Sequence, residues 1–223
     1  MRATDGHSRI NYMKKNLVII FDFDGTIVDS INSVNKIMNQ LSGELGFKKM
    51  AKNEFEKLKE EKTGRAFEKM DIPFKRISFI LKKVKVVLAK EIKNIKPVKG
   101  MKKVLLRLKR KGYKLGILTS SLSKNVKIFL DKNRLNIFNF SYSGSNLFEK
   151  DKRMRKILNK EKLNPENVFY VGDETRDIEA AKKAGIKSIA VTWGFNKEKI
   201  LRKQKPDYLI KKPEELIKLL DKF

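Results

Sequence analysis

Two acidic residues follow a short apolar segment near the start of the sequence. Leu17 to Phe21 is an uninterrupted apolar run, and the residues after it read Asp22-Phe-Asp24-Gly25-Thr26. Asp22 could supply a nucleophilic carboxylate, and Asp24 could protonate a leaving oxygen and later deprotonate a water. Gly25 permits a sharp bend that exposes backbone N–H groups to an anion. Either acid alone would fit a turn or a helix cap, but both together after a buried strand favour catalysis.

A hydroxyl pair and a lysine follow two later apolar segments. Thr119 and Ser120 come directly after the run that ends at Leu118, so the Thr119 hydroxyl and the next backbone N–H could hold a phosphoryl oxygen. The alternative is that Thr119 caps the following helix. Lys150 lies beyond a weaker apolar segment and could place a positive charge between a nucleophile and a phosphate. Lys152 is a rival for this role, and in a lysine-rich chain either could instead be a solvated helix residue.

Two further acids follow the apolar segment Val168 to Val171. Asp173 comes directly after Gly172, and Asp177 lies four positions later (177 − 173 = 4). On a loop that leads into a helix, this spacing brings both carboxylates to one side. Together with Asp22 they would form an oxygen-rich pocket suited to a hard divalent cation, of which Mg²⁺ is the natural choice. The acids therefore predict a magnesium site.

These residues need a scaffold that brings the ends of several strands together. Apolar segments at 17–21, 114–118, 138–142, 168–171 and 187–191 alternate with helical segments at 101–111, 124–131, 151–162 and 177–184, before an edge strand at 208–210 and a helix from Pro213. This alternation predicts an α/β fold with a Rossmann-like, doubly wound parallel sheet. Ligands bind at the carboxyl ends of such strands, where all of the polar groups above would meet.

The segment between the first two predicted strands has a different pattern. From Ile31 to Ile95 apolar residues recur at helical spacing, with breaks expected at Gly43, Gly46, Gly64 and Pro73. We therefore predict a disordered leader over residues 1–15, an α/β core formed by residues 16–29 and 97–223, and a small all-helical cap over residues 30–96.

The motifs occur in an order that is known from one family. The chain resembles the haloacid dehalogenase (HAD) superfamily, in particular its phosphoglycolate phosphatase-like branch, in having Asp-x-Asp-Gly-Thr, an apolar strand ending in Thr, a Lys and Gly-Asp-x-x-x-Asp in sequence. The match runs from about Leu17 to the C-terminus. Many relatives follow the lysine with Pro-x-Pro, whereas this chain reads Glu149-Lys150-Asp151-Lys152.

The resemblance implies a Mg²⁺-dependent phosphatase that acts on a small phosphate monoester through an aspartyl-phosphate on Asp22, with phosphoglycolate as one candidate. It implies that the metal is held by the side chains of Asp22 and Asp173 and the backbone carbonyl of Asp24. Asp177 would not bind the metal itself but would orient its ligands or a water molecule. The predicted catalytic residues are Asp22, Asp24, Thr119 and Lys150, and the predicted phosphate-binding residues are Gly25, Thr119, Ser120 and Lys150.

The composition limits the partners and the environment. A formal charge of +27, from 53 Lys and Arg against 26 Asp and Glu, would attract anions, but no RGG tract or basic repeat accompanies it, so nucleic-acid binding is not predicted. The absence of cysteine excludes disulfides, thiolate metal sites and cysteine nucleophiles. No apolar run approaches the ~20 residues that span a bilayer, and no signal peptide is apparent. We expect a soluble, cytoplasmic monomer or dimer.

Two other functions stay open at this level. A phosphomutase would share the core and differ mainly in cap residues that the sequence does not identify. A non-catalytic polyanion-binding protein on the same fold would suit the charge, but it predicts decayed motifs, and here they are intact. A dehalogenase is disfavoured because it has no leaving oxygen for Asp24 to protonate.

Overall fold

The computed structural model describes residues 17–144 and 149–223. The predicted leader, residues 1–15, lies outside the described residues. In the described part of the chain, six strands form one parallel sheet with the order β3-β2-β1-β4-β5-β6. Their bounds are β1 Val18–Phe21, β2 Lys114–Thr119, β3 Phe140–Ser143, β4 Val168–Gly172, β5 Lys187–Val191 and β6 Tyr208–Ile210. This is the strand order of a doubly wound Rossmann-like sheet, so the predicted fold class is confirmed.

The central strand β1 shows why the sheet needs helices on both faces. Its residues are all buried, and successive side chains point to opposite sides. Ile19 and Phe21 pack with α6 Met101–Arg110, α7 Ser123–Asn133 and α11 Glu215–Leu220. Val18 and Ile20 pack with α8 Lys150–Lys160 and α9 Thr175–Ala184. The side chains of this continuous apolar run are thus buried in two separate cores, one on each face of the sheet.

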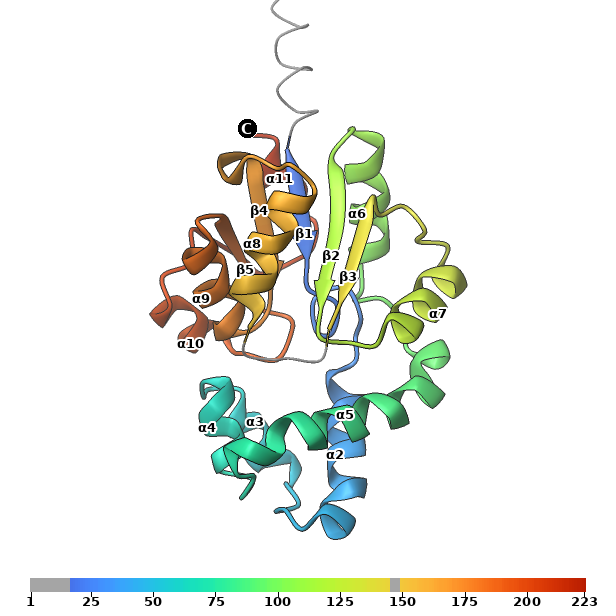
Figure 1. Cartoon of the computed structure of the whole chain (residues 1–223), viewed down its shortest axis with the longest axis vertical. Helices are drawn as coiled ribbons and strands as arrows, with labels where there is room; N and C mark the ends of the chain where they lie inside the picture. Colours follow the sequence, from blue (N-terminus) through green and yellow to red (C-terminus); the bar gives the residue numbers. More distant parts are fainter. Residues whose placement is uncertain (1–16, 145–148) are drawn as a thin grey trace, which may run out of the picture.

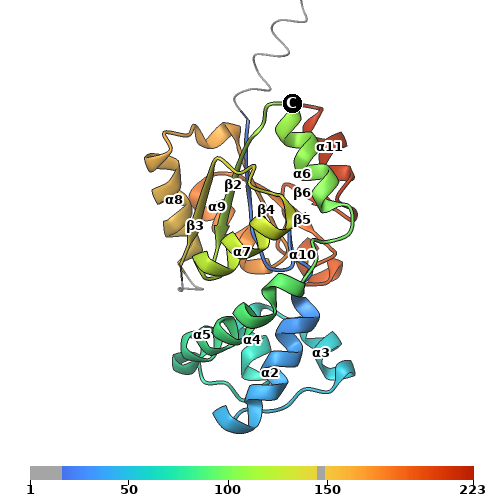
Figure 2. The ribbon, with the colours of Figure 1, turned by 90° about the vertical axis from the view of Figure 1, so that its right-hand side faces the viewer.

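A helical unit lies beyond the carboxyl ends of the strands. It contains α2 Ile31–Leu45, α3 Lys52–Leu58, α4 Thr63–Glu68, α5 Phe74–Glu91 and the 3₁₀ turn η1 Ile92–Asn94. In Figures 1 and 2 it forms a separate lobe below the sheet, and the arrows of β2 and β3 point toward it. These helices bury their own apolar cluster, including Ile37, Leu58 and Ile80. The lobe therefore folds around a second core.

The two connections to this lobe run side by side. Val28 and Pro97 form an isolated antiparallel bridge, and the Asp29 N–H donates to the Lys96 carbonyl at 3.1 Å. This paired segment joins the lobe to the sheet directly below the end of β1. We refer to α2–α5 and η1 as the cap.

Some predicted boundaries inside the cap were wrong. Gly43 and Gly64 do not break helices but lie within α2 and α4, whereas Gly46 ends α2 in a left-handed conformation. A glycine inside a helix costs only about 1 kcal/mol relative to alanine, which the packing of the apolar face can offset. A further short helix, α10 Glu198–Lys203, was not predicted, because only Leu201 of its residues is fully buried.

Candidate active site

Asp22 occupies the first position after β1, at the point where the strand order reverses. Its N–H continues the sheet by donating to the Val171 carbonyl at 2.8 Å, and only 3% of the residue is exposed. One carboxylate oxygen accepts from the Phe23 N–H at 2.8 Å, and the other lies 2.9 Å from Nζ of Lys150. A buried carboxylate is thus held in a fixed orientation beside a buried cation.

Asp24 sits two residues further on, where the chain bends toward the cap. Its two carboxylate oxygens accept hydrogen bonds from different hydroxyls, one from Ser30 at the start of α2 at 2.9 Å and one from Ser121 beyond β2. The carboxyl group therefore lies between the sheet and the cap and lines the cavity that separates them. A proton donor for a leaving group would have to occupy such a place.

Gly25 makes the close packing of this loop sterically feasible. Its φ of +77° is in the left-handed region, and a Cβ atom there would stand 2.3 Å from Oδ2 of Asp173. A side chain at this position would therefore displace a carboxylate of the site. The next residue, Thr26, donates its hydroxyl hydrogen to Oδ1 of Asp173 at 2.6 Å.

The two rival lysines have opposite environments. Lys150 begins α8, is 3% exposed as a side chain, and lies 2.9 Å from Asp22 and 2.5 Å from Asp177. The Lys152 side chain is 70% exposed and pairs with Glu149 at 3.2 Å. The geometry therefore favours Lys150 as the cation of the site.

Three buried carboxylates gather around that single lysine. Oxygens of Asp22, Asp173 and Asp177 lie within 4.8 Å of one another. Burial raises the pKa of Asp173 well above its ordinary value, and the negative charges of Glu174, Asp177 and Asp22 raise it further. Burial likewise raises the pKa of Asp177, although Lys150 opposes this. In their ionised forms the three carboxylates carry more negative charge than Lys150 neutralises, which, together with burial, favours the neutral forms of Asp173 and Asp177.

A hard divalent cation fits this donor set, because it would offset the surplus charge with oxygen ligands. Asp22 and Asp173 are suited to ligation, together with the Asp24 carbonyl. Both oxygens of Asp173 accept hydrogen bonds, from the Thr26 hydroxyl and the Phe195 N–H. Asp177 differs in that one of its oxygens contacts Lys150, while the other accepts from the Glu174 N–H at 3.0 Å. Its contacts suit a residue that positions the lysine.

Thr119 ends β2 next to these groups. It is 1% exposed, and its hydroxyl oxygen accepts from the Ser121 N–H at 2.9 Å. The N-cap position of α7 is Leu122, so Thr119 is not the helix cap that the sequence left open. A hydroxyl that accepts one hydrogen bond can also donate one, as a phosphate ligand requires. Ser120 follows at the edge of the cavity.

Several residues around the site were missed by the sequence analysis. Lys85 of α5 is 8% exposed and donates from its amino group to the Ser120 carbonyl. Burial lowers its pKa to about 8, and the attraction of Asp24 only partly opposes this. Helix α5 contains several lysines. Lys85 lies on the apolar face of this helix, three positions before Leu88, and this spacing is the feature of the sequence that could have indicated its burial.

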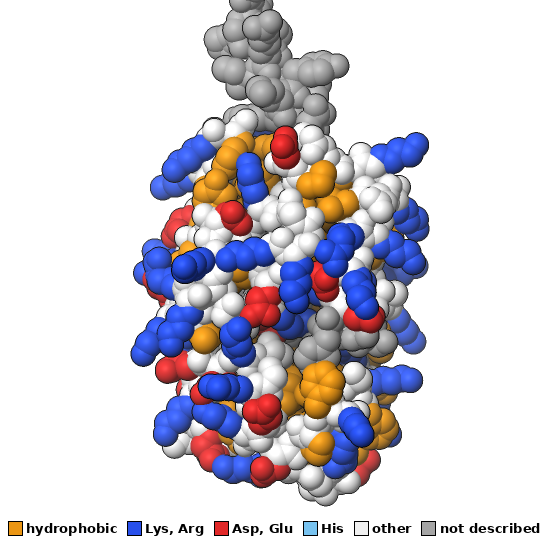
Figure 3. Space-filling view, turned by 60° about the vertical axis from the view of Figure 1, so that its left-hand side comes forward, with side chains coloured by type: hydrophobic (Ala, Val, Ile, Leu, Met, Phe, Trp, Pro, Cys, Tyr) orange, Lys and Arg blue, Asp and Glu red, His pale blue; other side chains and the backbone are white. Residues whose placement is uncertain are grey.

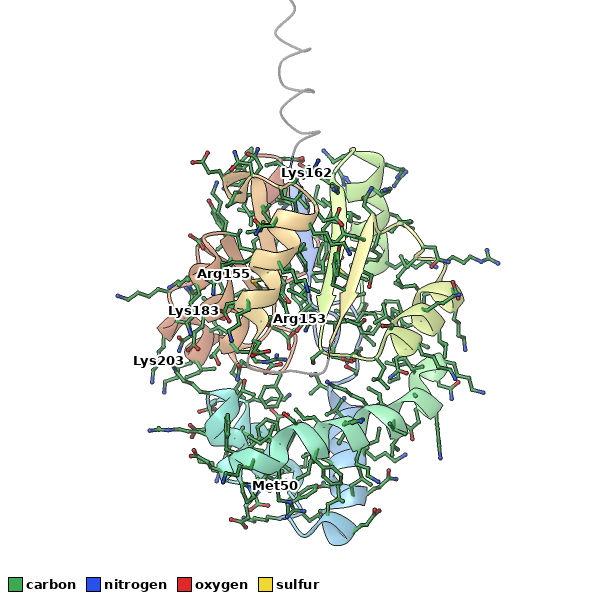
Figure 4. All side chains as sticks on the ribbon, viewed as in Figure 1. Met50, Arg153, Arg155, Lys162, Lys183 and Lys203 are labelled. Atoms are coloured by element: carbon green, nitrogen blue, oxygen red, sulfur yellow. The ribbon has the colours of Figure 1, made fainter. Side chains whose placement is uncertain are left out.

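Arg153 holds the ends of β2 and β3 together. It donates to the Thr119 carbonyl at 2.9 Å and to the Tyr142 carbonyl at 3.2 Å. Arg153 belongs to the first turn of α8, and Figure 4 labels it beside the lower ends of the strands. No local pattern marks this residue, because its partners come from other elements.

Glu174 and Arg176 pair with each other at 2.5 Å. Burial opposes ionisation of Glu174, but the charge and hydrogen bond of Arg176 hold its pKa at about 2. The same carboxylate accepts from the Thr63 hydroxyl of the cap at 2.8 Å. This ion pair therefore joins the core to the cap.

Comparison with known proteins agrees with this geometry. The family model described as haloacid dehalogenase-like hydrolase matches residues 19–191. The chain belongs to the haloacid dehalogenase-like hydrolases. The predicted family is thus confirmed, and the matched segment contains every site residue discussed above.

Similar HAD proteins include two that are named phosphoglycolate phosphatase. The protein from Synechococcus elongatus is 31% identical over 200 residues, which cover 89% of this chain and 94% of the relative. The protein from Aquifex aeolicus is 30% identical over 208 residues, covering 92% and 96%. A predicted phosphatase from Clostridium acetobutylicum has the same fold, with a TM-score of 0.79 at 20% identity over 93% of this chain and 99% of that one.

The chain is therefore an enzyme of this hydrolase family, and it resembles the phosphatases within it. No helix in the described ranges is long and apolar enough to cross a membrane. Figure 3 shows Lys and Arg side chains spread over the whole of the face in view, with acidic side chains among them, rather than gathered in one patch.

Proposed function

We propose that this HAD protein is a Mg²⁺-dependent phosphatase that hydrolyses a small phosphate monoester through a phosphorylated Asp22. The observation that carries the proposal is the contact of the buried Asp22 carboxylate with Lys150 at 2.9 Å, with Asp24 two residues away at the cavity. A nucleophile, a cation and a proton donor are the parts that this chemistry needs.

In the first step, a carboxylate oxygen of Asp22 bonds to phosphorus, and the bond from phosphorus to the substrate oxygen breaks. Asp24, in its protonated form, gives its proton to the departing oxygen. In the second step Asp24 accepts a proton from water, the water oxygen bonds to phosphorus, and the bond to Asp22 breaks. Inorganic phosphate leaves, and both carboxyl groups return to their starting states.

The remaining polar groups would hold the phosphoryl oxygens during both steps. Lys150 supplies a fixed positive charge, while the Thr119 hydroxyl and the Ser120 N–H can donate. The N–H of Gly25 already donates to the Val28 carbonyl at 2.9 Å, so the role of Gly25 is to shape the turn. A bound Mg²⁺, held by Asp22, Asp173 and the Asp24 carbonyl, would neutralise charge on the transferring group. Asp177 keeps Lys150 in position through its 2.5 Å contact.

Phosphoglycolate is the first substrate to assay, since it is the one named for the two relatives that resemble most of this chain. We also propose that residues 30–96 act as a cap on a core of residues 16–29 and 97–223, and that the enzyme works in the cytoplasm.

A hydrolysis assay with and without chelator tests the proposed function. Activity should disappear with EDTA and return with Mg²⁺. Asp22→Asn should abolish turnover while preserving the thermal unfolding temperature, because the amide is nearly isosteric but cannot attack phosphorus. Full activity of Asp22→Asn, or Mg²⁺-independent turnover, would contradict the proposal.

A further inference from the structure

A cavity of about 150 Å³ separates the catalytic loops from the cap. At its core end it is bounded by Asp24, Ser120 and Asp173. At its cap end the walls are apolar side chains from α2, α3, α4 and α5, among them Met38, Phe55, Phe67, Leu81, Val84 and Leu88. Figure 1 shows α5 crossing below the strand ends, and its residues Leu81, Val84 and Leu88 form part of the cavity wall.

The charged groups of this cavity lie close to the chemistry, and Asn35 of α2 is a further polar residue of its wall, with a buried side-chain oxygen that has no hydrogen-bond partner among the described residues. Glu174 is occupied by Arg176 and by Thr63, and the Lys85 amino group donates to the Ser120 carbonyl. Beyond Lys85 the wall continues through Val84, Leu81 and Leu88 of the same helix. A substrate would therefore meet charged groups near the phosphate and, apart from Asn35, an apolar surface further in.

The position of Asp24 fixes which part of a substrate would enter. If Asp24 protonates the leaving oxygen, that oxygen lies at the mouth of the cavity, and the alcohol portion of the substrate points toward the cap. An apolar cavity of 150 Å³ is known to accommodate a benzene molecule. A two-carbon carboxylate such as glycolate would leave the apolar walls unfilled and would bring a second anion toward them.

We propose that the cavity selects phosphate monoesters whose alcohol portion carries an apolar group about the size of one six-membered ring. This inference rests on the proposed phosphatase function and names the substrate class of the same site. The selectivity arises from burial of the ring against the cap, since each buried methylene contributes a factor of about four in kcat/KM.

The test compares three esters of primary alcohols on the Mg²⁺-loaded wild-type enzyme: ethyl phosphate, phosphoglycolate and benzyl phosphate. We expect kcat/KM for benzyl phosphate to exceed the other two values by at least about tenfold. A preference for phosphoglycolate over benzyl phosphate would overturn the inference while leaving the phosphatase function intact. Absence of hydrolysis for every ester would instead contradict the phosphatase function.

A matched pair of variants tests the cavity itself. Ala66 of α4 lies in the cavity wall and is 4% exposed, so Ala66→Leu would fill part of the space. The ratio of kcat/KM for benzyl phosphate to that for ethyl phosphate should fall about tenfold in this variant. Ala89→Leu on α5, outside the cavity wall, should preserve the ratio. An unchanged ratio in a folded Ala66→Leu enzyme would overturn the inference, and if that variant does not fold, the comparison of the three esters decides alone.

Discussion

The residues of this site are distinguished from their neighbours by burial and contacts more than by type. Lys150 and Lys152 have the same side chain and lie two positions apart, but only Lys150 reaches Asp22 and Asp177. The motif acids could be predicted from the sequence because each follows a strand that is recognisable by itself. Lys85 and Arg153 could not, because their roles depend on partners from elements far away in the chain.

Substitution of the two lysines separates a catalytic charge from a surface charge. Lys150→Ala should lower kcat by on the order of a hundredfold, because a preorganised charge next to the transferring group acts mainly in the transition state. Lys152→Ala should stay within a few-fold of wild type. Steady-state kinetics on a phosphate monoester measures both, and a reversed order would place the catalytic cation at Lys152.

Lys85 offers a second prediction, on stability. Its pKa of about 8 in the folded protein lies below the ordinary value of 10.5. Below pH 8 the amino group is charged in both the folded and the unfolded protein, so burial of the charge lowers the stability in full. As the pH rises from 8 toward 10.5, the folded protein loses this charge first and the destabilisation disappears. Lys85→Met should therefore raise the free energy of unfolding by about 1–3 kcal/mol at pH 7, with a gain that shrinks above pH 8.

Urea unfolding in metal-free buffer at pH 7 and pH 10 measures this effect. Lys82 lies on the exposed side of the same helix, and Lys82→Met should change stability by no more than about 0.5 kcal/mol at either pH. A Lys85→Met protein that is less stable than wild type at pH 7 would show that the amino group contributes more through its contact with Ser120 than its burial costs.

At the scale of elements, glycine illustrates where sequence patterns succeed and fail. Gly25 was expected at a sharp turn, and its backbone does have a positive φ. Gly43 and Gly64 were expected to break helices by the same intrinsic preference, but both lie inside helices of the cap. Tertiary packing explains this difference between the glycines. The apolar faces of α2 and α4 are buried in the cap core, and this burial stabilises the helices although a local pattern does not reveal it.

Gly25 and Gly43 form a matched pair for substitution by alanine. Gly25→Ala should reduce the free energy of unfolding by about 1–3 kcal/mol and impair activity, because the new Cβ meets Asp173 in a strained backbone conformation. Gly43→Ala, with no atom within 4 Å of the new Cβ, should stabilise the protein by about 0.5–1 kcal/mol. Thermal unfolding of both variants checks the pair, and equal effects would mean that the Gly25 turn tolerates a side chain.

At the scale of the whole molecule, the cap meets the core through contacts between distant parts of the chain. The side-chain amide of Asn196 donates to the carbonyls of Lys59 at 3.2 Å and Glu61 at 2.9 Å. The Lys197 N–H donates to the same Lys59 carbonyl at 2.9 Å. The sequence predicted that a helical insert would cover the strand ends, but not which of its residues touch the core, because those contacts span more than a hundred positions.

The central claim, that Asp22 carries the phosphoryl group, is tested most directly by trapping that group. In Asp24→Asn, attack by Asp22 can still occur on an activated ester such as p-nitrophenyl phosphate, whose leaving group needs no proton, but the water step loses its base. Acid quenching, proteolysis and mass spectrometry of this variant with substrate and Mg²⁺ should then find one phosphoryl group, on the peptide containing Asp22. Turnover without any phosphorylated peptide, or phosphorylation at another residue, would contradict the account.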